Sequence, residues 1–186
     1  MAYLGQFQLE AMGFKSLGKN VKISDRASIY NPDQIEIGDE SRVDDFCVLS
    51  GLIFMGRNVH IAPFCLVAGG EYGVYLSDFS GLAYNSQVFS QSDDYTGKTL
   101  TNPTIPDNYK LEKKKAVYLG KHVIVGASSV ILPGVNVAEG CSIGALSLID
   151  RRTKPWGIYA GNPAKRIRER KKDLLELEKQ FLAEKS

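Results

Sequence analysis

An aliphatic residue recurs at every sixth position along most of the chain. A period of six matches neither an amphipathic helix nor simple strand alternation, and it is typical of short strands joined by tight turns. Three such strands make one triangular coil of about eighteen residues, so the pattern predicts a stack of coils. Parallel strands of neighbouring coils then pair at about 4.8 Å, and equivalent positions form inward ladders. The recurring positions are Leu17, Ile23, Ile29, Ile37, Val43, Leu49, Met55, Ile61, Val67, Leu76, Leu82, Val88, Leu119, Val125, Ile131, Val137, Ile143 and Ile149.

Small residues follow the same period. Gly, Ala or Ser often comes directly after the aliphatic residue, as in Ile37-Gly38. Four residues after the aliphatic one the side chain is again small or apolar, and Cys47, Cys65 and Cys141 all occupy this position. We therefore interpret the three cysteines as small buried residues, and not as nucleophiles, metal ligands or a disulfide framework.

Three interruptions of the repeat and both chain ends depart from this pattern. We expect the extra residues at 35–36, 73–75 and about 94–118 to bulge outward as loops, and the last is long enough to be a functional element. Residues 3–13 and 166–183 are expected to form helices that cover the two open edges of the stack. The predicted divisions are an N-terminal helical cap (1–16), a β-helix (17–154) and a C-terminal segment with a helix (155–186).

Charge is uneven along the chain. The formal net charge of the 186 residues is +2, yet residues 163–172 form a basic run. Such a run contacts phosphate groups or lies on a solvated face, and without interleaved aromatic residues it does not indicate nucleic-acid binding. The sequence shows no signal-peptide pattern and no apolar stretch long enough to span a bilayer. We therefore expect a cytoplasmic protein without a transmembrane segment.

Three motifs in the C-terminal half narrow the class of solenoid. They are LGKHVIVGASSVILPGV at 119–135, IGALS at 143–147 and YAGNPAK at 159–165. Together with the hexad they resemble the hexapeptide-repeat acyltransferases, in particular galactoside and maltose O-acetyltransferases and the acetyltransferases of polysaccharide biosynthesis. The resemblance implies an all-β solenoid, a left-handed parallel β-helix of about six coils. It also implies a homotrimer with active sites between subunits, and acetyl-CoA as the acyl donor.

The same resemblance implies how the donor is bound. Two small residues one coil apart match positions whose backbone contacts the pantetheine arm, and a polar-then-basic pair matches contacts to the same cofactor. Basic residues after the Asn-Pro turn match contacts to the nucleotide phosphates. The implied cofactor-binding residues are Ala127, Ala145, Asp150, Arg151, Lys165 and Arg168.

The catalytic base is left open between several candidates. Attack on a thioester needs a base, and histidine suits this role near neutral pH. His60 is preferred, because the matching position of related enzymes lines the acceptor pocket, and Glu71 aligns with an acidic residue that would orient the imidazole. The register puts Asp93 where many relatives carry the catalytic histidine, and repulsion within the Asp93-Asp94 pair would raise the pKa of one carboxyl. His122 is expected at the surface or at the edge of the cofactor, and it is a further candidate for the base.

The acceptor is the least defined part of the predicted site. Tyr84, Asn85, Asp94 and Tyr95 are candidate substrate-binding residues, since aromatic rings stack on the apolar faces of pyranoses. We expect O-acetylation of a sugar in the biosynthesis of a cell-surface polysaccharide such as O-antigen or capsule. N-acetylation of a nucleotide-linked amino sugar and acetylation of an antibiotic are the alternatives. A zinc hydratase on this fold needs three histidines per site and the chain has two, so we expect no metal.

Overall fold

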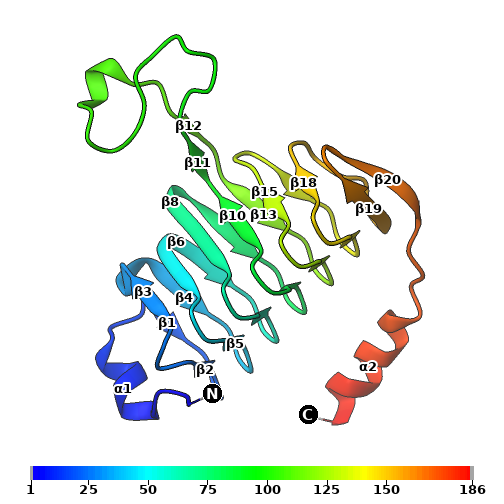
Figure 1. Ribbon diagram of the computed structural model, residues 1–186. Helices are drawn as coiled ribbons and strands as arrows, with labels where there is room; N and C mark the ends of the chain where they lie inside the picture. Colours follow the sequence, from blue (N-terminus) through cyan, green and yellow to red (C-terminus); the bar gives the residue numbers. More distant parts are fainter. Residues whose placement is uncertain (1, 185–186) are drawn as a thin grey trace.

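The computed structural model describes residues 2–184, and most of them form one stack of triangular coils (Figure 1). Each coil has three faces, and the strands of neighbouring coils pair in parallel. The prediction of a left-handed parallel β-helix with short terminal helices is confirmed.

Strands of the same face follow one another along the stack. The first face holds β1 (Ser16–Leu17), β4 (Ile35–Ile37), the second halves of β6 (Val48–Met55) and β8 (Leu66–Leu76), β13 (Val117–Leu119) and β16 (Asn136–Val137). The second face holds β2 (Lys22–Ile23), β5 (Arg42–Val43), β7 (His60–Ile61), β9 (Gly81–Leu82), β14 (Ile124–Val125), β17 (Ser142–Ile143) and β19 (Gly157–Gly161). The third face holds β3 (Ser28–Tyr30), the first halves of β6 and β8, β10 (Gln87–Phe89), β15 (Val130–Ile131) and β18 (Leu148–Ile149).

Three corners join these faces, and we number them in chain order. The first corner joins the first face to the second, the second corner joins the second face to the third, and the third corner leads into the next coil. A residue with positive φ turns the chain at most of the first and second corners. Such residues are Asn20, Glu40, Asn58, Phe79, His122 and Trp156 at the first corner, and Phe46, Phe64, Asn85, Ser128 and Leu146 at the second.

The core consists of the predicted inward ladders. Every position of the aliphatic hexad belongs to the core, and all except Leu17 and Ile29, in the first coil, are fully buried. The glycine after the aliphatic residue is explained by close contact between coils, since a Cβ on Gly38 would lie 2.6 Å from the backbone of Gly56. Neighbouring coils therefore approach through backbone at these positions.

The cysteines occupy the small inward positions as expected. All three are free and buried. The Cys47 thiol lies 3.0 Å from the carbonyl oxygen of Ala62, and the Cys65 thiol lies 3.1 Å from that of Ala83, each in the next coil. The contact with Cys47 and, to a lesser extent, burial raise the pKa of the Cys65 thiol, which makes it a poor nucleophile.

Each longer insertion leaves the stack at the third corner. The predicted bulges at 35–36 and 73–75 are wrong in register, because Ile35 and Val74 are fully buried strand residues two positions before the hexad residue. The extra residues lie just before them, in the turn that contains the 3-10 helix η1 (Pro32–Gln34) and in the bend at 69–73 of β8.

The longest insertion forms an arm at the same corner. It leaves through β11 (Gln91–Ser92), contains the 3-10 helix η2 (Asp107–Tyr109) and returns through β12 (Lys113–Lys114), which is antiparallel to β11. We call residues 91–116 the arm, and Figure 1 shows it projecting from the stack. Val117 is already fully buried in the first face, so the insertion ends before the predicted limit of 118.

The two chain ends are covered differently. Helix α1 (Gln6–Ala11) buries Leu9 against the first coil. At the other end, β20 (Ala164–Glu169) pairs antiparallel with β19, so the predicted helix over 166–183 is wrong at its start. The open edge of β19 explains this, because its unpaired backbone groups are satisfied by a returning strand. Helix α2 (Leu174–Glu184) packs beside the first corner, where the rings of Phe181 and Phe79 meet edge to face at 6.1 Å.

We expect Ile61→Ala to lower the free energy of unfolding by about 2–5 kcal/mol, because Ile61 is fully buried in the middle of the second-face ladder. Ile124→Ala is the matched control, since Ile124 lies on the same face but is 48% exposed, and it should cost less than about 1 kcal/mol. Denaturant unfolding measures both. Equal losses would contradict the inward assignment of Ile61.

Candidate functional site

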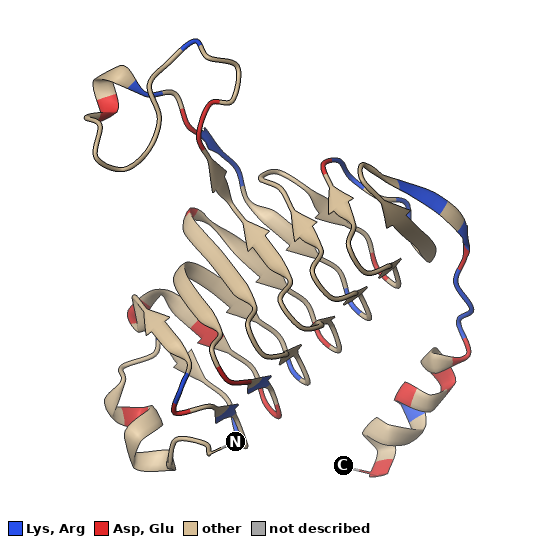
Figure 2. Cartoon of the chain, in the orientation of Figure 1, with Lys and Arg blue, Asp and Glu red and all other residues tan. Residues whose placement is uncertain are grey.

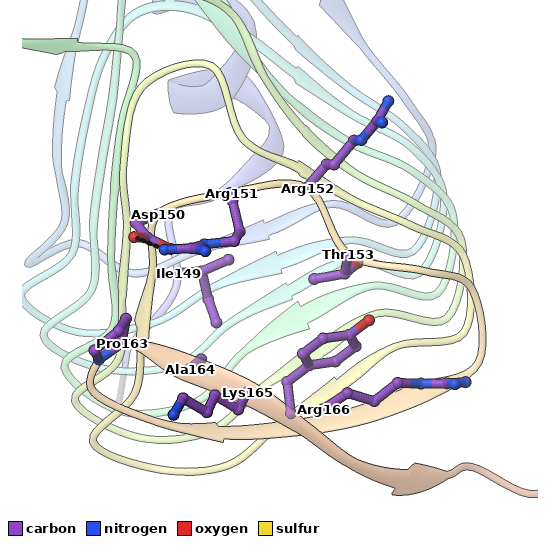
Figure 3. A pocket seen from close by; sticks show the side chains of 10 residues that line it. Ile149, Asp150, Arg151, Arg152, Thr153, Pro163, Ala164, Lys165 and Arg166 are labelled. Atoms are coloured by element: carbon purple, nitrogen blue, oxygen red, sulfur yellow. Dashed lines mark hydrogen bonds and ion pairs between the residues drawn. The ribbon is translucent and has the colours of Figure 1, made fainter.

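A pocket at the C-terminal end of the stack holds several of the predicted donor-binding residues. Its volume is about 320 Å³, and the turn after β18 and the β19–β20 hairpin line it. In Figure 3, Asp150 and Arg151 lie on one side of the pocket and Lys165 and Arg166 on the other. Arg151 donates two hydrogen bonds of 2.8 Å to Asp150, which hold the pKa of the Asp150 carboxyl below its ordinary value. The charged Asp150 thereby fixes the Arg151 guanidinium at the pocket.

Positive charge gathers around this pocket. Figure 2 shows Lys and Arg along β20 and the segment that follows it. Lys165 is exposed, and Arg166 pairs with Glu169 at 2.6 Å. Arg168 lies on the same strand but is not among the residues that line the pocket. A phosphate-bearing ligand would find a favourable potential here.

The second corner brings four of the predicted residues into one column. Tyr84 and Asn85 turn one coil, Ala127 turns the next, and Ala145 turns the one after. The Asn85 side-chain amide donates a hydrogen bond of 3.2 Å to the Ser128 hydroxyl, which ties the first two of these coils together. Toward the C-terminal end of the stack, this corner therefore changes from the aromatic and polar Tyr84 and Asn85 to the small Ala127 and Ala145.

The arm positions the remaining predicted acceptor residues at the third corner. Asp93, Asp94 and Tyr95 line a pocket of about 490 Å³ together with Lys113 and Pro133. Tyr95 is 91% exposed. β10 separates this group from Tyr84 and Asn85, so the predicted acceptor residues do not meet within one chain.

Asp94 shapes the start of the arm. Its carboxylate accepts hydrogen bonds from the backbone N–H groups of Thr96 (2.9 Å), Lys98 (3.1 Å) and Thr99 (3.2 Å). These hydrogen bonds, with those of Thr96 foremost, hold the pKa of Asp94 below its ordinary value. A raised pKa through repulsion from Asp93 is therefore wrong for Asp94, because local donors stabilise its charged form.

His60 is oriented by a carboxylate, although not by the predicted one. Glu71 lies at the third corner, where it lines a pocket with Gln91, whereas His60 begins β7 on the second face. The His60 Nε2 atom is 2.8 Å from Oδ2 of Asp44. Arg42 donates hydrogen bonds of 2.6 Å and 2.9 Å to the two Asp44 oxygens. The expectation that Glu71 orients His60 is thus corrected, because the two residues belong to different sides of the coil.

Asp44 is the buried centre of this cluster. Its side chain is 2% exposed, and burial disfavours its charge, but hydrogen bonds from Arg42 and His60 outweigh burial and hold the pKa of Asp44 below its ordinary value. Tyr3 also donates a hydrogen bond to Asp44, at 3.4 Å. The His60 side chain is 50% exposed, so a buried anion fixes one ring nitrogen while the rest of the imidazole meets solvent. A carboxylate that orients a histidine in this way prepares it for proton transfer.

Sequence reasoning missed Asp44, although the repeat carries a signal for it. Arg42 and His60 are eighteen residues apart, so they are neighbours in one column, as their pairing across β5 and β7 shows. Asp44, two residues after Arg42, directly follows the end of β5 and contacts the His60 ring of that column. The period therefore could have predicted the cluster.

His122 lies beneath α2, and its predicted place at the surface or at the cofactor edge is corrected. The side chain is 8% exposed, and its Nε2 atom is 2.9 Å from Oε2 of Glu178. Its ring stacks on Phe79 with centroids 5.3 Å apart. Burial disfavours charge on Glu178, but hydrogen bonds from Lys121 and His122 hold the pKa of Glu178 below its ordinary value. His122 therefore fastens α2 to the first corner.

Two further properties of residues 2–184 bear on the chemistry. No three His, Cys, Asp or Glu side chains of this range are grouped so that they could hold a metal ion. Within the same range, neither helix has the length and apolarity that a membrane crossing requires.

Comparison with known proteins finds relatives along nearly the whole chain. A dTDP-4-amino-4,6-dideoxy-D-glucose acyltransferase of Escherichia coli is 44% identical over 184 residues, which cover 97% of this chain and 95% of the relative. WbbJ of Escherichia coli K12, named for O-acetyl transfer in lipopolysaccharide biosynthesis, is 29% identical over 124 residues, 63% of this chain and 61% of WbbJ. No protein-family model matches the chain.

Solved structures agree with this relationship. AntD, an N-acyltransferase of Bacillus cereus, was solved in complex with dTDP and 3-hydroxybutyryl-CoA. Its sequence is 44% identical to this chain, and the two structures match with a TM-score of 0.97 over 98% of this chain and 97% of AntD. A variant of AntD was solved with dTDP-4-amino-4,6-dideoxyglucose and coenzyme A, also with a TM-score of 0.97. A maltose O-acetyltransferase of Clostridium difficile is 19% identical over 87% of this chain and 73% of its own, with a TM-score of 0.57, and it shares the fold.

We expect Asp44→Asn to lower the free energy of unfolding by about 1–3 kcal/mol at pH 7, since it removes a buried acceptor of charged hydrogen bonds. Because the folded-state pKa of Asp44 is lowered, this stability is present above the unfolded pKa of about 3.9 and is lost as pH falls through the folded pKa. Unfolding measured from pH 7 to pH 2 should therefore show the two proteins converging in acid. Asp150→Asn is the control, because its partner Arg151 is largely exposed and the pair should contribute about 0–1 kcal/mol. A constant gap at all pH values would contradict the assignment.

Proposed function

We propose that this chain acylates the amino group of a dTDP-linked 4-amino-4,6-dideoxy sugar. The chain belongs to the hexapeptide-repeat acyltransferases, which use a coenzyme A thioester as donor. The single observation that carries this proposal is the 44% identity, over nearly the full length of both chains, to a dTDP-4-amino-4,6-dideoxy-D-glucose acyltransferase. The AntD complexes support the same acceptor and donor classes. Acylation of an amine is thereby favoured over the sugar O-acetylation expected from the sequence.

The charge around the C-terminal pocket supports a site for coenzyme A. Arg151, Lys165 and Arg166 surround the pocket, and each cation can pair with a phosphate of the cofactor. Arg168 stands on β20 just outside the lining and is proposed to contact the cofactor from its rim. Ala127 and Ala145 are proposed to expose their backbone to the pantetheine arm, where larger side chains would block its approach.

The reaction needs a neutral amine and a site for the proton that it releases. The amine nitrogen attacks the thioester carbonyl, the new C–N bond forms, the C–S bond breaks, and coenzyme A leaves as a thiolate. We propose that His60, held by Asp44, accepts the proton of the attacking amine and passes it to the thiolate. Glu71 and Asp93 lie at the third corner and are proposed to attract the acceptor in its ammonium form.

A homotrimer is proposed as the active form. Tyr84 and Asn85 lie at the second corner and Asp94 and Tyr95 at the third, so a complete acceptor site requires two copies. The arm projects from the third corner and is suited to reach the second corner of a neighbouring copy (Figure 1). This arrangement would unite the predicted acceptor residues without any change in the chain.

O-acetylation of a glycan remains the second candidate. The observation that favours it is the partial match to WbbJ, which covers 63% of this chain. The nucleophile is a hydroxyl oxygen in this reaction and an amine nitrogen in the first proposal. An amino sugar and the matching hydroxyl sugar, tested as acceptors, can therefore distinguish the two functions.

We expect the purified protein to acylate dTDP-4-amino-4,6-dideoxyglucose when supplied with acetyl-CoA or 3-hydroxybutyryl-CoA. Release of coenzyme A thiol and the mass of the product measure the reaction, and calorimetric titration of acetyl-CoA tests the donor site independently. The matched control is dTDP-6-deoxyglucose, which carries a hydroxyl in place of the amine. Turnover of the hydroxyl sugar but not of the amino sugar would reject N-acylation in favour of O-acylation.

We expect His60→Ala to lower kcat by about 10²- to 10⁴-fold with little change in acetyl-CoA affinity, as loss of a general base should. Asp93→Ala should lower turnover at least about 10-fold through weaker binding of the amine. The two variants can also be unfolded and refolded together in equal amounts. If His60 and Asp93 act from neighbouring copies, one in four neighbouring pairs then holds both native residues, so about a quarter of native turnover should return. Near-normal turnover of folded His60→Ala would remove His60 from this role, and no recovery in the mixture would place both residues in one copy.

A further inference from the structure

Two phenylalanines form an exposed stack on the second corner. Phe46 and Phe64 belong to neighbouring coils, with ring centroids 5.1 Å apart and planes inclined by 16°. Phe46 is 48% exposed and Phe64 is 57% exposed. The Arg26 guanidinium, from the coil before, lies over the Phe46 ring at 5.7 Å from its centroid. The stack therefore runs along the solenoid, with Arg26 at one end and the Phe64 ring at the other.

The backbone of these two residues is strained. Phe46 has φ of 60° and Phe64 has φ of 66°, a region that bulky side chains rarely adopt and that favours residues such as Asn. At the first corner the strained aromatic residues Phe79 and His122 have a packing partner, because α2 contacts both. Phe46 and Phe64 keep the same unfavourable conformation while about half of each side chain meets solvent. Positive φ is the turn geometry of this corner, which Asn85, Ser128 and Leu146 share. Phe46 and Phe64 differ from them in presenting two stacked aromatic rings to solvent, a surface suited to a planar ligand.

The stack is continuous with the column of predicted donor and acceptor residues. Asn85 turns the coil after Phe64, and Ala127 and Ala145 turn the two coils after that. With coils about 4.8 Å apart, the side of the Phe64 ring away from Phe46 is turned toward the Asn85 coil, and the Ala127 coil follows about 10 Å from Phe64. A nucleotide-linked sugar is an extended molecule with its base at one end. The amine at the sugar end must reach the thioester, so the base at the other end lies away from it. If the donor binds at Ala127 and Ala145, the base therefore lies toward Phe64.

We propose that the Phe64 ring is the platform on which the nucleobase of the acceptor stacks, with Phe46 and Arg26 holding that ring in place from behind. This inference rests on the proposed function and adds the residues that bind the nucleotide. Stacking on an aromatic face suits a planar pyrimidine, and the Asn85 amide in the next coil offers both a donor and an acceptor to the base edge or the sugar. Phe64 then acts on binding of the acceptor and not on the chemical step.

Phe64→Ala tests this directly. We expect it to raise the KM for dTDP-4-amino-4,6-dideoxyglucose and the Kd for dTDP by roughly 5- to 150-fold, which corresponds to loss of stacking on one base. kcat at saturating acceptor and the Kd for acetyl-CoA should stay near native values. Phe64→Tyr should restore native KM, because it keeps the aromatic face.

Tyr118→Ala is the matched control. The exposed Tyr118 and the half-buried Tyr75 form a similar stack on the first face, with centroids 4.9 Å apart and planes inclined by 14°. Removing that ring should change neither KM nor the Kd for dTDP. A second control is 4-amino-4,6-dideoxyglucose 1-phosphate, which lacks the base, and Phe64→Ala should not change its KM.

The outcomes separate this inference from the proposed function. If the native protein acylates the dTDP-linked amino sugar but Phe64→Ala has native KM and Kd for dTDP, the platform is rejected and the proposed function stands. If Phe64→Ala alters the molar mass by light scattering, the stack covers a second copy and the platform is likewise rejected. If the native protein neither binds dTDP nor acylates the amino sugar, the proposed function itself fails and the platform fails with it.

Discussion

The parallel backbone pairing between coils is the constraint on which the rest of this structure depends. A coil can hydrogen-bond to its neighbours along all three faces when its strands repeat at a fixed spacing. The inward side chains must then match from coil to coil, which is why aliphatic residues line the faces and small residues fill the tight corners. Because the strands of all three faces pair with neighbouring coils and their inward side chains form the core, the residues of the candidate site lie at the corners and at outward positions.

The corners divide these tasks. The third corner takes up the longer insertions of the repeat, including the arm, and so carries the carboxylates of Glu71 and Asp93. The second corner carries the strained phenylalanine stack, followed by Asn85 and the small residues of the proposed donor site. The first corner is closed by α2, which is anchored through Glu178. In the proposed homotrimer, groups from the second corner of one copy and the third corner of another would meet at the acceptor.

Much of the fold could be predicted from the sequence, because a repeat displays each structural rule many times. The hexad correctly assigned its own aliphatic positions and the three cysteines to the core. It failed at Ile35 and Val74, where a strand begins two residues early and the alternation within that strand also turns these residues inward. The separate expectation of a helix from residue 166 was wrong over 166–169, where charged residues that suit a helix instead pair with the open edge of β19.

The candidate site was less accessible to sequence reasoning, since its contacts join single residues rather than columns. The motif after β18 placed Asp150, Arg151 and Lys165 around one pocket. The partner of His60 was misassigned, because Glu71 was chosen by alignment to relatives while Asp44 is a neighbour through the coil period. The burial of His122 under α2 depends on a contact between residues 56 positions apart, which no local pattern signals.

The reversal of β20 has a consequence for how such molecules behave at high concentration. A stack of parallel coils is open-ended by construction, like the growing tip of a fibril, and another chain could in principle extend it indefinitely. Because β20 runs against β19, it presents the wrong strand direction to an incoming parallel coil and ends the second face. Leu9 and α1 close the opposite tip. The protein thus has a fibre-like architecture of fixed length. The antiparallel β20 at one end and α1 at the other prevent further coils from adding to the stack.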